Sequence, residues 1–150
     1  MKDDCYLPWK KIEVEPFVKE AVITSNRHPA DALFNGIDRV IGEEENAWVC
    51  QKGDWAEIDF GKEIDISRLR LVFDSDLNDP KRMPHIWPLG EHMQALPECL
   101  VKGYTLSSRC NGVWTDVISE TDNYQRNVAH QVSFTADALR LTVNESYGAD

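Results

Sequence analysis

The chain has 150 residues, of which 42% are hydrophobic, and it carries a formal net charge of −10. This length and composition predict a single domain with a packed core and argue against a disordered chain. We expect no nucleic-acid partner, because phosphate contacts need clustered Lys and Arg and the sequence holds no such run. No apolar stretch reaches the ~20 residues needed to span a bilayer.

The chain opens with an irregular lead-in segment, residues 1–18, and residues 19–150 are expected to form the folded domain. A short strand is predicted at 20–24, which is apolar and β-branched. Residues 29–34 predict one or two helical turns. The acidic run at 43–45 is expected to lie in an exposed loop.

The clearest strand pattern follows, in residues 55–60 and 66–73. Apolar and polar side chains alternate in both runs, which is the period of a sheet with one face on a core and the other in water. Gly61-Lys62 lies between the runs. We therefore predict two half-buried strands joined by a tight turn.

Residues 74–98 form the largest irregular segment, and their four prolines exclude a central strand. A loop of this length in a compact domain is often functional. Asn111-Gly112 tolerates the positive φ of a tight hairpin turn, so a hairpin is predicted there. Further strands are predicted at 101–108, 113–118, 130–134 and 139–143. Eight or so short strands with few helices indicate an all-β sandwich or jelly roll.

The order of these motifs resembles the discoidin or coagulation factor 5/8 type C family, also called galactose-binding-like domains. The matching residues are 35–36, 48, 55–62, 66–71, 102–104, 112–114 and 138–143. This resemblance covers residues 20–150 and implies a jelly-roll β-sandwich with no catalytic residue of its own. It also implies that the family's final strand is lacking, because the sequence reaches Asp150 before that strand would begin.

A closer resemblance is to the C-terminal module of bacterial FAD-dependent oxidoreductases, and it is carried by residues 3–8, 73–77 and 122–126. It implies an upstream catalytic domain that holds the flavin, with this chain as a non-catalytic accessory module. No cofactor is expected in this chain itself, which has no G-x-G-x-x-G sequence. Its location would follow that of the parent protein, extracytoplasmic or at the cell surface if the parent is secreted.

Carbohydrate sites combine an aromatic wall with a few polar anchors. Trp87 and Tyr124 both lie in predicted loops. His85 is close in sequence to Trp87, and Asn123 and Arg126 flank Tyr124. We therefore predict that these five residues bind carbohydrate.

The remaining tryptophans considered are assigned to the scaffold. Trp48 occupies a position that packs in the core in this family, while Trp55 and Trp114 are strand residues that cover a sheet face. The four cysteines show no C-x-x-C spacing, so we interpret them as free thiols. A disulfide would require an oxidising compartment.

A structural calcium ion is the one metal that the resemblance implies, and family members hold it with an Asp at the position of Asn35. Hard cations favour oxygen ligands, so the candidates are Asn35, Asp38, Asp74 and Asp76. The segment that starts at Asp74 does not match an EF-hand loop. The alternative is that Asp74 and Asp76 end a strand and bind backbone amides.

Three functions stay open at this point. The first is a carbohydrate-binding accessory module of a larger enzyme. The second is a structural or interaction domain that packs on its parent's catalytic domain without a ligand, which the uncharged Asn35 favours. The third is an independent glycoside hydrolase, which would need two carboxylates at a set separation. No pair stands out among the 26 acidic residues, and no G-x-S-x-G occurs.

Overall fold

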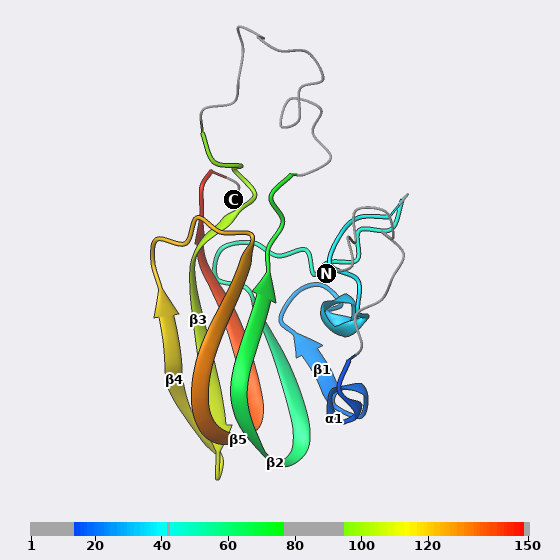
Figure 1. Ribbon diagram of the computed structural model, residues 1–150, viewed down its shortest axis with the longest axis vertical. Helices are drawn as coiled ribbons and strands as arrows, with labels where there is room; N and C mark the ends of the chain where they lie inside the picture. The colour runs from blue at the N-terminus through cyan, green and yellow to red at the C-terminus, as the bar shows by residue number, and fades with distance from the viewer. Residues whose placement is uncertain (1–13, 42, 77–94, 149–150) are drawn as a thin grey trace, which may run out of the picture.

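The computed structural model describes residues 14–41, 43–76 and 95–148 (Figure 1). In chain order its elements are α1 (Pro16–Lys19), β1 (Val22–Ser25), the 3-10 helix η2 (Asp31–Phe34), β2 (Trp55–Val72), β3 (Val101–Cys110), β4 (Val113–Glu120) and β5 (Asn127–Ser146). The strands form one antiparallel sheet in the order β1-β2-β5-β3-β4, which confirms the all-β prediction. Neither helix in these residues has the length and apolarity to cross a membrane.

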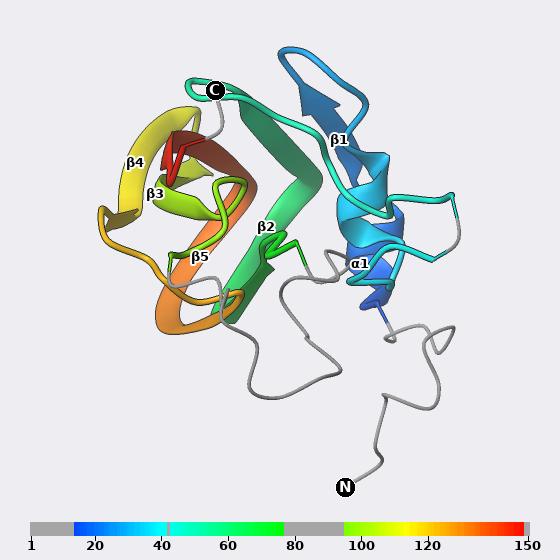
Figure 2. The same cartoon turned by 90° about the horizontal axis from the view of Figure 1, so that it is seen from above.

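The sheet becomes a sandwich because its two longest strands fold back on themselves. β2 and β5 both reverse direction at the lower end of Figure 1, and Figure 2 shows their halves in two layers. Residues 55–59 of β2 pair with 138–142 of β5, while residues 64–72 of β2 pair with 127–136 of β5. Strands β1, β3 and β4 extend only the first of these layers.

The bend of β2 lies at Gly61, where the sequence predicted a tight turn. Gly61 has a φ of 67°, which glycine adopts without steric cost, and its N–H donates to Oδ1 of Asp59 at 2.8 Å. The prediction of two separate strands is corrected, because the structure holds a single strand, β2, whose halves pair with β5. The strands predicted at 130–134 and 139–143 are likewise one strand, β5.

The core lies between the two layers. Tyr104 of β3 is fully buried, with its ring 5.2 Å from that of Phe73, and a 2.7 Å hydrogen bond joins its Oη to Nε2 of His130 in the other layer. Burial, helped by the charge of Glu120, raises the pKa of Tyr104 to about 12. The phenol therefore stays protonated and keeps this bond across the sandwich.

Several local predictions are confirmed. Asn111 and Gly112 have φ values of 52° and 76° in the turn between β3 and β4, as a two-residue hairpin requires. Helical turns appear at η2, and Trp48 is 8% exposed within the core.

The lead-in segment predicted at residues 1–18 ends inside α1, whose Phe17 ring lies edge-on to that of Phe60 at 5.8 Å. The division of the chain at this point stays a prediction, as does the lack of a final strand.

We expect Leu100→Ala to lower the free energy of unfolding by about 2 to 5 kcal/mol, because it opens a cavity in the core. Leu100 is 1% exposed, whereas Leu96, in the same segment, is 40% exposed. Leu96→Ala is therefore the matched control and should change stability by less than about 0.5 kcal/mol. Urea unfolding followed by circular dichroism measures both variants, and equal losses would contradict this account of the core.

Candidate functional site

The described ligand candidates lie at one end of the sandwich, the upper end in Figure 1. We call it the loop end and define it by residues 73–76, 95–100, 121–126 and 147–148. Backbone hydrogen bonds join these segments, since Phe73 N donates to Arg126 O and Asn123 N donates to Lys102 O, each at 2.8 Å. The other two candidates, Trp87 and His85, lie outside the described residues, so their role in binding stays a prediction.

Asn123 fixes the shape of the loop between β4 and β5. Its buried Nδ2 donates to the carbonyl oxygens of Val101 at 2.7 Å and Gln125 at 3.1 Å, and its Oδ1 accepts from Gln125 N at 3.0 Å. The amide is thus engaged by the protein's own backbone. Its neighbour Tyr124 points outward and is 64% exposed, which makes it the most exposed aromatic side chain among the described residues.

Arg126 connects this loop to the segment that follows η2. Its Nη2 donates to the backbone oxygen of Asp38, and the Asp38 carboxylate lies 3.0 Å from Nη2 of Arg70 on β2. Asp38, a predicted metal ligand, therefore lies beside the loop end, and its carboxylate pairs with an arginine. Sequence reasoning placed Arg126 and Asp38 in different candidate sites, and the structure brings them together.

The predicted calcium ligands do not form one cluster. Oδ1 of Asn35 accepts from Ile37 N, and Oδ1 of Asp74 accepts from Asp76 N, both at 2.8 Å. These are turn contacts, as the alternative interpretation of Asp74 predicted. Within the described residues, no group of three or more His, Cys, Asp or Glu side chains could hold a metal ion. Calcium binding stays a prediction.

The described cysteines, Cys50, Cys99 and Cys110, are free thiols, as predicted. Burial is the main cause that raises the pKa of each, and it raises the pKa of Cys50 to about 11. Since the thiolate is the nucleophile and the metal ligand, these cysteines are poorly suited to either task.

A second group of charged and aromatic side chains lies on the face of the larger layer that points away from the core. Sequence reasoning did not identify it as a site. We call it the outer-face cluster; its members are Trp55, Glu57, Asp59, Arg109, Trp114, Asp137 and Arg140. It is held by two cross-strand rows, Glu57–Arg140–Ser107–Asp116 and Asp59–Ala138–Arg109–Trp114.

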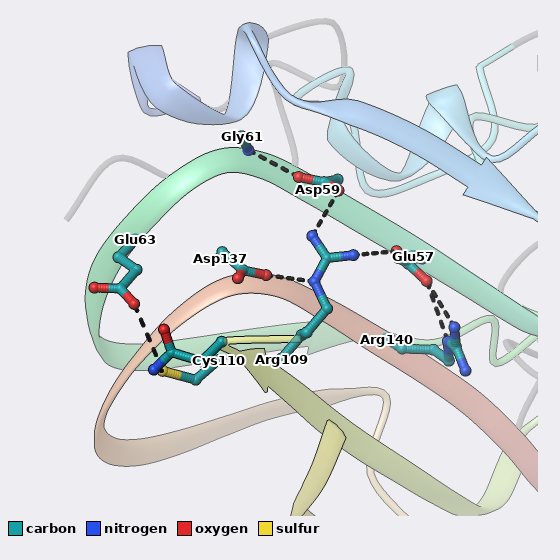
Figure 3. Close-up of polar contacts among 9 residues, drawn as sticks. Glu57, Asp59, Gly61, Glu63, Arg109, Cys110, Asp137 and Arg140 are labelled. Carbon is teal, nitrogen blue, oxygen red and sulfur yellow. Dashed lines mark hydrogen bonds and ion pairs between the residues drawn. The ribbon is translucent and has the colours of Figure 1, made fainter. Parts of the chain in front are cut away.

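Arg109 is the centre of the ion pairs in this cluster (Figure 3). Its Nη2 lies 2.7 Å from Oδ2 of Asp59 and its Nη1 lies 3.5 Å from Oε1 of Glu57, while its Nε donates to Asp137. Hydrogen bonds to Asp59 and Asp137 raise the pKa of Arg109, and the bond from Arg109 holds the pKa of Asp59 below its usual value. Arg109 and Asp59 therefore stay charged at neutral pH.

Arg140 connects the ion pairs to two indole rings. Arg140 donates to Oε2 of Glu57 from Nε at 3.3 Å and from Nη2 at 2.8 Å. The guanidinium carbon lies 4.7 Å from the ring centroid of Trp55 and 4.3 Å from that of Trp114, within cation–π range. Trp114 of β4 thus reaches across β3 to a side chain of β5.

No protein-family model matches the chain, and no curated protein matches its sequence. Solved structures do match its fold. The family 32 carbohydrate-binding module of C. perfringens NanJ, in complex with galactose, is 14% identical, with 87% of each chain covered and a TM-score of 0.58. The family 32 carbohydrate-binding module of Streptococcus pneumoniae EndoD is 15% identical over 89% of this chain and 88% of that one, with a TM-score of 0.61.

A third similar structure is chitosan-binding module 2 of a chitosanase/glucanase from Paenibacillus sp. IK-5, in complex with chitotriose. It is 14% identical over 89% of this chain and 90% of that one, with a TM-score of 0.61. The chain thus has the galactose-binding-like jelly-roll fold of family 32 carbohydrate-binding modules, and the predicted fold class is confirmed. Identities this low establish the fold alone.

Asp59→Asn should weaken the acid sensitivity of the fold. Because the folded pKa of Asp59 is lowered from 3.8, its carboxylate stabilises the fold above that value, and this stability is lost as the pH falls through the folded pKa. Melting temperatures measured between about pH 5 and pH 2 should therefore fall less steeply in this variant. Asp116→Asn is the control, because the hydrogen bond that Asp116 accepts comes from the neutral Ser107 hydroxyl and not from a guanidinium. An unchanged slope for Asp59→Asn would contradict the ion-pair assignment.

Proposed function

We propose that the chain is a non-catalytic carbohydrate-binding accessory module of a larger enzyme. The observation that carries this proposal is Tyr124, whose exposed ring is presented by a loop that the buried Asn123 amide fixes. A pyranose ring can stack its apolar face on such an aromatic surface while nearby polar groups bind its hydroxyls. Because the loop is already fixed, little entropy is lost when a sugar binds.

The similar structures support this proposal. Three modules with this fold and nearly this length are named for carbohydrate or chitosan binding, and two of them hold galactose or chitotriose. Each of these modules takes its name from, or is derived from, a larger protein, so an accessory role suits the fold. The sequence carries no recognised catalytic motif, which favours a binding function over hydrolysis.

The parent enzyme is a separate part of the proposal. The sequence resemblance at residues 3–8, 73–77 and 122–126 favours a FAD-dependent oxidoreductase that would supply the catalytic domain upstream. In that arrangement the module keeps the enzyme near a glycan and takes no part in the flavin chemistry.

We expect Tyr124→Ala to weaken sugar binding at least about tenfold, which corresponds to about 1.4 kcal/mol, because the variant removes the stacking surface. A glycan array first identifies the sugars that bind. Calorimetric titration with galactose and with chitotriose then compares the variant with the unmodified chain. A chain that binds nothing on the array would overturn the proposal.

Val113→Ala is the matched control for this experiment. Val113 is also 64% exposed, but it lies in the β3–β4 hairpin at the opposite end of the sandwich, so its removal should leave affinity unchanged. If both variants lost affinity equally, Tyr124 would not be the stacking surface.

The second candidate function is a docking module that binds its parent's catalytic domain and no sugar. It is favoured by the loop end itself, where Asn123 and Arg126 bond to the protein's own backbone and so offer fewer anchors to a ligand. Sedimentation of the chain mixed with the separately produced catalytic domain distinguishes the two functions. A stable complex together with an empty glycan array supports docking, and no complex contradicts it.

A further inference from the structure

We propose that the outer-face cluster is a second carbohydrate-binding surface, separate from the loop end, on which Trp55 and Trp114 stack against the sugar rings of an oligosaccharide. This inference rests on the proposed function and adds a second site to it. No residue of the cluster belongs to the loop end, and its members come from β2, β3, β4, β5 and the bend of β5.

Both indoles lie where core packing does not account for them. Neither Trp55 nor Trp114 belongs to either hydrophobic cluster of the core, and both stay partly exposed on the outward side of the layer. Large aromatic side chains on an open sheet face leave apolar surface in water. The apolar face of a sugar ring would cover that surface.

The ion pairs of the cluster are partly exposed. The side chains of Arg109 and Arg140 are 25% and 32% exposed, and those of Asp59 and Asp137 are 35% and 24% exposed. Ion pairs at such positions contribute about 0 to 1 kcal/mol each. Their clearer effect is geometric, because they hold long side chains in one conformation.

A chain of contacts fixes the positions of the two indole rings. Asp59 and Asp137 hold Arg109, and Arg109 and Arg140 both hold Glu57. Arg140, fixed in turn by Glu57, touches both indole rings. A binding surface built on strands and supported by a second set of side chains in this way is already organised before its ligand arrives.

Polar anchors are available on the same face. Within the described part of the chain, neither indole N–H donates to another group, so both can donate to a sugar hydroxyl. Asp116, in the row of Glu57 and Arg140, is exposed and uses one carboxylate oxygen for Ser107. The face therefore combines aromatic surface with hydrogen-bonding groups, as a carbohydrate site requires.

Affinity electrophoresis in gels that contain glycol chitosan, β-1,4-galactan or hydroxyethyl cellulose tests this surface. We expect Trp114→Ala and Trp55→Ala each to be retarded less than the unmodified chain in at least one gel. The apparent affinity calculated from the retardation should fall about tenfold. Trp114→Phe, which keeps a ring, should retain most of it. Thr115→Ala is the control, because Thr115 is exposed next to Trp114 on the opposite face of β4.

The two sites are separated by combining variants. The Tyr124→Ala variant should still bind through the outer-face cluster. Adding Trp114→Ala to that variant should remove the remaining binding. If Tyr124→Ala abolishes retardation and the tryptophan variants match the unmodified chain, the second surface is refuted while the proposed function stands. If the unmodified chain is retarded in none of the three gels and binds nothing on a glycan array, both are refuted.

Nuclear magnetic resonance measures ligand binding on the unmodified chain, and variants are needed only to assign the signals. Each indole N–H has its own resonance in the ¹⁵N-labelled chain, and the tryptophan-to-phenylalanine variants assign the signals of Trp55 and Trp114. Addition of chitotriose or β-1,4-galactotriose should move both signals. Movement confined to the loop end, with both indole signals unchanged, would overturn the inference.

Discussion

The structure depends on one constraint, which is that β2 and β5 must fold back at the same level. Their halves form both layers of the sandwich, so a bend in only one strand would break the pairing between them. At the bend, residues 60–63 of β2 lie beside Asp137 of β5, and Ala136 and Ala138 on either side are fully buried. Arg109 contacts Asp59 on one bend and Asp137 on the other, so a single guanidinium ties them together (Figure 3).

Much of this fold could be predicted from local patterns. The alternation in residues 55–60 and 66–73 correctly indicates half-buried strands, and Gly61 correctly marks a reversal. What the pattern does not contain is the partner of each strand, because β2 pairs with residues about half the chain away. A turn between two alternating runs is typical of a hairpin, and local sequence does not distinguish it from a strand that folds between two layers. For the same reason the local pattern of β5 predicts two strands.

The candidate site residues show the same limit more sharply. Tyr124 could be predicted as an exposed aromatic residue because it lies in a polar loop between two strands. The role of Asn123 could not, since its partners include Val101, which is far from it in sequence. The outer-face cluster was hidden for a related reason. Trp55 and Trp114 were correctly assigned to a sheet face, but only the order β2-β5-β3-β4 brings them to the same guanidinium. The available signal was an Arg at 140 and a Glu at 57 on outward positions of predicted strands.

The two surfaces also differ in what holds them, and this difference bears on how each would recognise a ligand. Tyr124 depends on a short loop that one buried amide fixes, so changes in neighbouring loops can reshape its surroundings without cost to the core. The outer-face cluster is part of the sheet, and the arginine that supports it also ties the two bends together. Changes in Arg109 or Asp59 would therefore disturb the fold and the surface at once. A site built on loops can diversify in specificity, whereas one built on this sheet face keeps its geometry as long as the sandwich folds.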